Sequence, residues 1–199
     1  RSGANLTESQ KARIKDINSQ LATLGTKFNQ NVLAEVNASA VVVDTKAELA
    51  GLSDGQIAAA AEAAKTRKLE GKYVIALLNT TGQPTLTQLE NRALRERVYK
   101  ASIARGSRGG EFDNTGIVSQ VLKLRAERAK LMGYANHAAF VLEDETARSP
   151  EAVNAMMVKL APAAVANAKR EAVDMQAVID AEQKAKGQPS FKLEPWDWA

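Results

Sequence analysis

The stretch that decides the fold is SPEAVNAMMVKLAPAAVANAKREAVDMQAVIDAEQKAKG, residues 149–187. Its start favours a helix, because Ser149 suits the N-cap, Pro150 the first helical position and Glu151 the first turn. The pattern predicts one long amphipathic helix, which Pro162 is expected to kink or split because proline lacks a backbone donor. Eight apolar side chains are expected to fill its inner side: Val153, Met156, Met157, Leu160, Val165, Met175, Val178 and Ile179.

Helical patterns also dominate the chain before this stretch. A capping box of Thr7 and Gln10 opens a helix that is expected to run to about Glu35, with apolar residues every three or four positions. Four further helices are expected, at about 53–68, 85–101, 113–133 and 136–142. The first two of these also begin with capping boxes, and the broad apolar face of the third predicts deep burial.

Two short apolar runs interrupt the helices. The segments at about 39–44 and 73–78 are short, apolar and bounded by turn residues, so each predicts a strand. Two strands are too few for a main sheet, and we expect a small two-stranded β ribbon. No internal repeat or linker is visible. The sequence therefore predicts a mainly α, multi-helical fold in which residues 1–199 form a single helical unit.

The composition excludes several kinds of site. The chain of 199 residues has no cysteine and one histidine, His137, and its net charge is +4. It therefore lacks a disulfide framework, a thiolate metal site and an H-E-x-x-H zinc helix. No apolar run reaches the roughly 18–20 residues of a membrane span. The sequence assigns no catalytic, cofactor-binding or metal-binding residue.

Positive charge is concentrated in residues 65–108, where ten basic side chains stand against three acidic ones. Such a stretch could bind nucleic acid or attract anionic peptide termini, but it has no RNA-binding motif and no stacking aromatics in its Arg/Gly loop. A solvated helix surface is the favoured explanation. The ten are Lys65, Arg67, Lys68, Lys72, Arg92, Arg95, Arg97, Lys100, Arg105 and Arg108.

Three other features bear on function. His137 is expected to pack or hydrogen-bond near a helix start, because no second metal ligand is near it in the sequence. The acidic run 143–145 lacks the spacing of a calcium loop and is expected to be solvated. Trp196 and Trp198 carry much apolar surface, so we expect their packing partner to lie beyond residue 199.

Four segments carry a resemblance to a known family. These are NRALRERVY (91–99), RGGEFDNT (108–115), LRAERAKLMGYAN (124–136) and LEPWD (193–197). In order and spacing they resemble the N-terminal half of the M3 zinc metallopeptidases, and above all the bacterial peptidyl-dipeptidases related to oligopeptidase A. The resemblance spans essentially the whole chain.

The resemblance implies a helical enzyme of two halves that hydrolyses short peptides in a channel, using one zinc ion held by H-E-x-x-H and a later Glu. That motif is absent here, so no zinc-binding or catalytic role transfers to any residue of this chain. We expect a fragment that forms a channel wall and is inactive alone. Its expected partners are short peptides and the C-terminal catalytic half, with no membrane partner.

Two alternatives belong to other functional classes. The chain could be a stand-alone helical scaffold, or a nucleic-acid-binding module that uses residues 65–108. An accessory zinc-free relative of the family is a third reading. The start Arg1-Ser2-Gly3 suggests an excised segment, and the expected location is cytoplasmic, or periplasmic if an N-terminal signal was removed.

Overall fold

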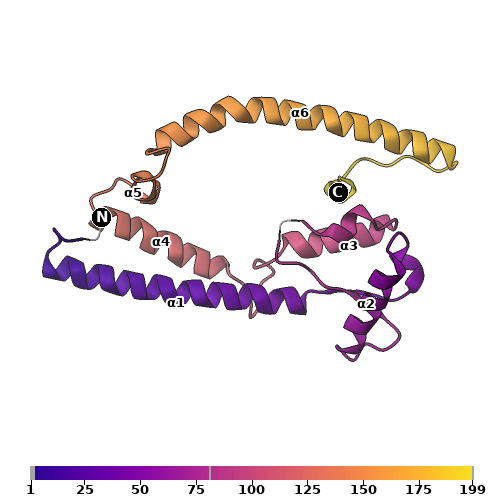
Figure 1. The fold of residues 1–199 in the computed structure, drawn as a ribbon, viewed down its shortest axis with the longest axis horizontal. Helices are drawn as coiled ribbons and strands as arrows, with labels where there is room; N and C mark the ends of the chain where they lie inside the picture. The colour runs from indigo at the N-terminus through magenta and orange to yellow at the C-terminus, as the bar shows by residue number, and fades with distance from the viewer. Residues whose placement is uncertain (1–2, 81, 199) are drawn as a thin grey trace. The chain divides into compact units, whose positions relative to one another are not determined.

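The computed structural model describes residues 3–80 and 82–198 and shows a mainly α protein, as predicted (Figure 1). The six α-helices and two strands of this described part occur in the order α1(Glu8–Ala38), β1(Val41–Val43), α2(Asp54–Lys65), β2(Tyr73–Ile75), α3(Arg92–Ile103), α4(Thr115–Leu131), α5(His137–Leu142) and α6(Pro150–Ala185). Three short 3₁₀ helices are η1(Lys46–Leu49), η2(Pro84–Thr87) and η3(Pro195–Asp197). Among the described residues, no helix combines the length and the apolar character that a membrane crossing requires.

Packing divides the described chain into two compact units. Residues up to 29 and residues 115–174 belong to the first unit, and residues 30–114 and 175 onward belong to the second. The helices α1 and α6 contribute residues to both units. The single helical unit expected from the sequence stays a prediction.

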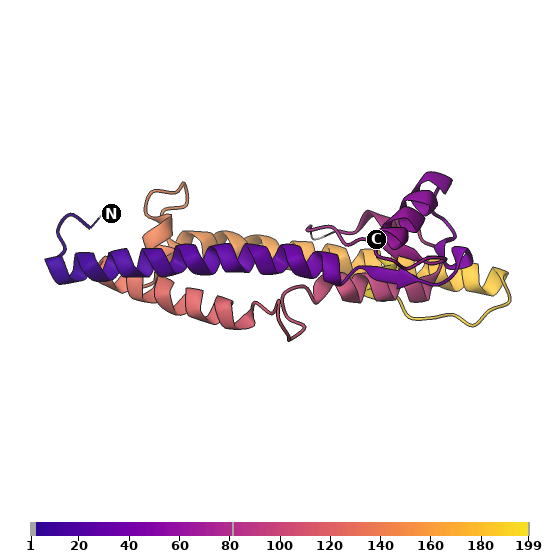
Figure 2. The ribbon, with the colours of Figure 1, turned by 90° about the horizontal axis from the view of Figure 1, so that it is seen from below.

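The first unit has few buried side chains. The helix α4 lies beside α1 (Figures 1 and 2), where Arg13 Nε and Nη2 donate to the two carboxylate oxygens of Glu127 at 2.6 and 2.7 Å. The predicted deep burial of the 113–133 helix is wrong, because Val118 is 43% and Leu122 60% exposed. Only part of its broad apolar face is covered within the unit, since Leu124 is buried there.

The second unit contains the hydrophobic core. The strands β1 and β2 pair antiparallel, with Val41 opposite Ile75 and Val43 opposite Tyr73, which confirms the ribbon. Both are shorter than predicted. After β2, Leu78 pairs its backbone N–H and C=O with the side chain of Gln83 and not with a strand. The ribbon, α2 and α3 enclose the core, which consists of Val41, Val43, Leu49, Ala60, Ile75, Leu77, Leu86, Leu89, Leu94 and Val98.

Most helix starts follow the local capping signals. Ser53 accepts a hydrogen bond from the Gln56 backbone, as the capping box predicts, and Ser149 Oγ accepts one from the Ala152 backbone at 3.2 Å. The helix α6 runs without a break through Pro162, so the expected split does not occur. Alanines flank this proline, and their high helix propensity keeps the helix continuous although one backbone hydrogen bond is missing.

The helix predicted from Thr85 is wrong at its start. A turn of 3₁₀ helix, η2, occupies the first residues, and α3 begins only after Asn91, whose side chain accepts the Leu94 N–H at 3.1 Å. The intervening residues are held elsewhere, because the Glu90 N–H donates to the Ala50 carbonyl at 3.0 Å. The backbone at Gly51 and the backbone at Gln88 lie so close together that a Cβ on Gly51 would be 1.9 Å from the Gln88 carbonyl oxygen.

Candidate functional site

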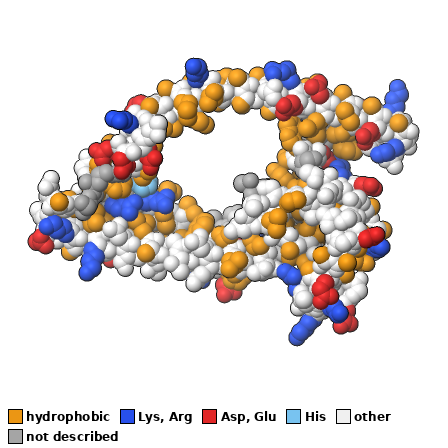
Figure 3. Space-filling view, in the orientation of Figure 1, with side chains coloured by type: hydrophobic (Ala, Val, Ile, Leu, Met, Phe, Trp, Pro, Cys, Tyr) orange, Lys and Arg blue, Asp and Glu red, His pale blue; other side chains and the backbone are white. Residues whose placement is uncertain are grey.

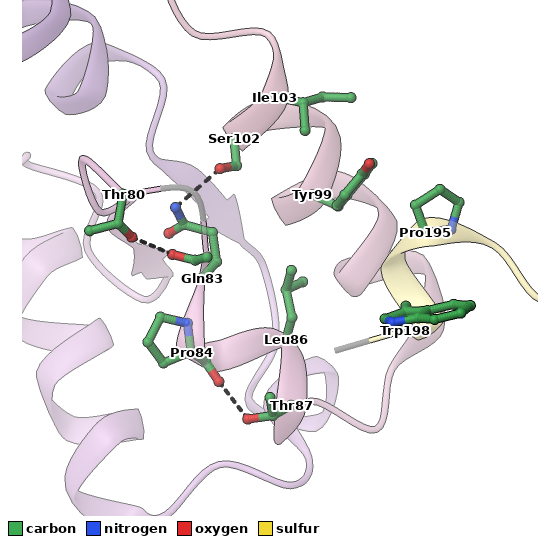
Figure 4. A pocket seen from close by; sticks show the side chains of 11 residues that line it. Thr80, Gln83, Pro84, Leu86, Thr87, Tyr99, Ser102, Ile103, Pro195 and Trp198 are labelled. Atoms are coloured by element: carbon green, nitrogen blue, oxygen red, sulfur yellow. Dashed lines mark hydrogen bonds between the residues drawn. The ribbon is translucent and has the colours of Figure 1, made fainter. Parts of the chain in front are cut away.

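An apolar groove in the second unit is formed by segments that are distant in the sequence. It lies between η2, the end of α3 and η3 and has a volume of about 550 Å³ (Figure 4). Its lining residues are Thr80, Gly82, Gln83, Pro84, Leu86, Thr87, Tyr99, Ser102, Ile103, Pro195 and Trp198. Sequence reasoning missed this groove, although two of the family-like segments, 91–99 and 193–197, contribute to it.

The polar side chains at one end of the groove are occupied with one another. The buried Gln83 donates from Nε2 to the Leu78 carbonyl at 3.0 Å and to Ser102 Oγ at 3.1 Å. Its Oε1 accepts the Leu78 N–H at 2.9 Å. These bonds fix the turn before η2 against α3, so they build the groove and leave it mainly apolar.

The exposed rim consists of large apolar side chains. Ile103 is 62% and Trp198 39% exposed, and both line the groove. Tyr99 is the one titratable side chain among the lining residues, which include no carboxylate, imidazole or amine that could serve as a general base. The groove is therefore suited to contact apolar groups.

A buried carboxylate anchors η3 beside the groove. Arg92 donates to both oxygens of Asp197, with Nη2 2.9 Å from Oδ2, and Arg95 Nη2 lies 2.8 Å from Oδ1. The Asp197 side chain is only 3% exposed. Burial alone would raise its pKa, but the hydrogen bonds from the two arginines outweigh this effect and hold the pKa below its ordinary value.

Aromatic contacts complete this anchor. The Trp196 ring lies 6.1 Å from the Tyr99 ring and 5.4 Å from the Lys100 Nζ. The expectation of a packing partner beyond residue 199 is therefore wrong for Trp196, because α3 supplies one. It stays a prediction for Trp198, which is 39% exposed. The C-terminal aromatic segment folds back onto α3 because Arg92 and Arg95 pair with its carboxylate. The Arg92 guanidinium also lies against the rings of Phe191 and Trp196.

The basic stretch 65–108 does not form a uniform solvated surface. Arg92 and Arg95 pair with Asp197, Arg108 Nε lies 2.8 Å from the buried Glu35, and Arg105 donates to backbone carbonyls. Within the described part of the chain, ion pairs involve seven of the ten cations of this stretch: Lys65, Lys72, Arg92, Arg95, Arg97, Lys100 and Arg108. Most of their partners lie outside the stretch, which the charge count within it could not reveal.

His137 lies at the start of α5, as expected. Its pKa is lowered, first by burial and then by the positive charges of Arg125 and Arg128. The same two charges would repel a metal cation, and no group of three His, Asp or Glu residues gathers in the described part of the chain. The acidic run 143–145 is exposed, as expected. The described residues thus do not fit a zinc site.

Comparison with known proteins identifies the family. The profile of peptidase family M3 matches residues 85–199. Dipeptidyl carboxypeptidase of Escherichia coli (strain K12) is 40% identical over 197 residues, which are 99% of this chain and 28% of that protein. Oligopeptidase A of the same organism is 32% identical over 202 residues, covering 100% of this chain and 29% of its own length.

A plant relative gives the same picture. The probable cytosolic oligopeptidase A of Arabidopsis thaliana is 31% identical over 98% of this chain and 28% of its own length. The chain thus spans less than a third of the length of these relatives. The matches cover both segments that meet at Asp197, 91–99 and 193–197. They confirm the resemblance seen in the sequence: the chain belongs to peptidase family M3.

Proposed function

We propose that this chain is the N-terminal, non-catalytic portion of a zinc-dependent M3 peptidase that hydrolyses short peptides. The observation that carries the proposal is the extent of the match, which covers 99% of this chain but 28% of the dipeptidyl carboxypeptidase. The chain has a single histidine and no H-E-x-x-H, so zinc chemistry belongs to another portion of the polypeptide. A cytoplasmic location is part of the proposal, supported by the name of the plant relative.

A hybrid polypeptide tests this function. We expect this chain to replace the matching region of the Escherichia coli dipeptidyl carboxypeptidase and to restore zinc-dependent hydrolysis of short peptides. The isolated chain should neither bind zinc stoichiometrically nor hydrolyse peptides. Turnover by the isolated chain with one bound zinc would contradict the proposal, as would a folded hybrid without activity.

We also propose that the chain forms a wall of the substrate channel, with the apolar groove as its contact surface for peptides. Ile103 is suited to test this role, because it lines the groove and is 62% exposed. Ile103→Ala in the hybrid is expected to raise KM about threefold and leave kcat unchanged, since it removes apolar contact of bound peptide only. Leu33→Ala is the matched control, because Leu33 is 64% exposed and outside the groove. Equal KM values for the two variants would contradict the proposal that the groove is part of the substrate channel.

The nucleic-acid alternative is not proposed. The arginines on which it depends, Arg92, Arg95 and Arg97, all form ion pairs with carboxylates of this chain. A guanidinium that is already paired and partly buried contributes less to phosphate binding than a solvated one. Salt-sensitive binding of the isolated chain to DNA or RNA, lost on replacement of these arginines, would revive that alternative.

A further inference from the structure

The middle of α6 is apolar and yet uncovered. Every residue from 154 to 171 is exposed in the structure, and Figure 3 shows hydrophobic side chains along this helix. The exposed fractions are 53% for Met156, 73% for Val158 and 56% for Leu160. The expectation that the apolar side chains of this helix fill an inner side is therefore wrong for its middle. Contiguous apolar surface of this kind marks an interaction site.

The apolar residues form two stripes on the helix. One stripe contains Met156, Met157, Leu160 and Ala164; Leu160 follows the two methionines by four and three residues, and Ala164 follows Leu160 by four. The other stripe lines a hollow of about 500 Å³ and consists of Val158, Ala161, Pro162, Val165, Ala166 and the stem of Lys169. Between residues 155 and 168 the only charged side chain is Lys159. A helix that is apolar on most of its circumference is typical of the interior of a large protein.

The relatives are much longer than this chain. The dipeptidyl carboxypeptidase matches 99% of this chain, so its match includes the region of α6, and a further 72% of its length lies outside the match. A portion of the same polypeptide that is covalently linked to this helix is present near it at a high effective concentration. We propose that residues 154–171 form an interface helix whose two stripes pack against the catalytic portion of the M3 peptidase. This inference rests on the proposed function.

The absence of cysteine makes a direct test possible. Leu160→Cys places a single thiol in the first stripe, and Lys159→Cys, its sequence neighbour on the polar side, is the matched control. In the isolated chain both thiols should react with a maleimide at similar rates, because both positions are exposed. In the hybrid with the Escherichia coli enzyme, the thiol at position 160 should react at least about tenfold more slowly, while that at 159 is unchanged. Mass spectrometry of the labelled peptide gives each rate.

The outcomes separate this inference from the proposed function. An active hybrid in which the thiol at 160 stays as reactive as the one at 159 would overturn the interface and leave the function intact. An inactive hybrid with a protected thiol at 160 would overturn the function and support the interface, and an inactive hybrid without protection would overturn both. Protection in the isolated chain that rises with protein concentration would assign the surface to a second copy of this chain instead.

Discussion

Asp197 is a residue that links the two chain segments of the second unit, residues 30–114 and residues 175 onward. It lies 105 residues from Arg92 in the sequence, and its carboxylate receives hydrogen bonds from both Arg92 and Arg95. Because the carboxylate is almost fully buried, its loss would leave two guanidinium groups without their shared partner. The position of Trp198 at the groove depends on this ion-pair cluster, since Trp198 directly follows Asp197, the last residue of η3.

The first prediction concerns the strength of this anchor. Asp197→Asn is expected to lower the free energy of unfolding by about 2–4 kcal/mol, because it breaks a buried ion pair. Glu96→Gln is the control, on the helix α3 that carries Arg92 and Arg95, and its exposed pair with Lys100 should contribute less than about 1 kcal/mol. Denaturant titration monitored by circular dichroism measures both values, and equal losses would contradict the role assigned to Asp197.

The pKa of Asp197 adds a pH dependence to this prediction. Its value is lower in the folded than in the unfolded chain, so its stabilisation is present above the unfolded value of 3.8 and declines as the pH falls through the folded value. The stability difference between the wild type and Asp197→Asn should therefore be constant at neutral pH and shrink below about pH 4. A difference that does not depend on pH would argue against an ionised carboxylate.

The second prediction concerns His137, which gives the only histidine signal in an NMR spectrum of this chain. Burial and the charges of Arg125 and Arg128 lower its pKa below 6.5, so the folded state binds fewer protons than the unfolded state there. Stability should therefore fall as the pH drops from 6.5 toward the folded pKa. Arg125→Gln should raise the measured pKa by removing one positive charge. A wild-type pKa at or above 6.5 would contradict this environment.

At the scale of the elements, local signals set the helix starts and longer contacts shift some of them. Ser53 and Ser149 cap their helices through bonds that close within three residues, so the sequence predicts them correctly. The capping box at Thr85 fails because Gln88 bonds through its side chain to Gln56 in α2, at 2.6 Å. That bond links residues 32 positions apart, and a short sequence window does not contain it.

The third prediction tests the start of α3. Asn91→Ala is expected to cost about 1 kcal/mol of stability, because it removes the acceptor for the Leu94 N–H. Asn91→Ser should retain most of the stability, since serine also caps well. Thr85→Ala should lower the stability less than Asn91→Ala does. A larger loss of thermal stability for Thr85→Ala would support the helix start at Thr85 that the sequence predicts.

At the scale of the whole molecule, the described chain consists of two compact units that share two helices. The core of large aliphatic side chains lies in the second unit, whereas the first buries few side chains. A small core gives little stabilisation on its own. Whether the first unit folds independently therefore decides if the single helical unit predicted from the sequence is correct.

The fourth prediction tests whether the two units unfold together, using the natural tryptophan and histidine side chains as probes. Trp196 and Trp198 lie in the second unit, and His137 lies in the first. If the chain is a single helical unit, tryptophan fluorescence and the His137 NMR signal will give the same denaturant midpoint. An earlier midpoint for His137 would show that the first unit unfolds separately. Asp197→Asn should then shift the tryptophan midpoint alone.

The sequence by itself determined the types of the elements, most helix starts, the two-stranded ribbon and the family. These properties depend on caps, hydrophobic periodicity and short motifs, which act within a few neighbouring residues. Tertiary structure alone decided which charges are neutralised, where the groove lies, and that the Trp196 side chain is packed while the middle of α6 is not. Those properties depend on contacts between distant segments, such as Arg92 with Asp197, and on surface that a side chain finds or lacks after folding.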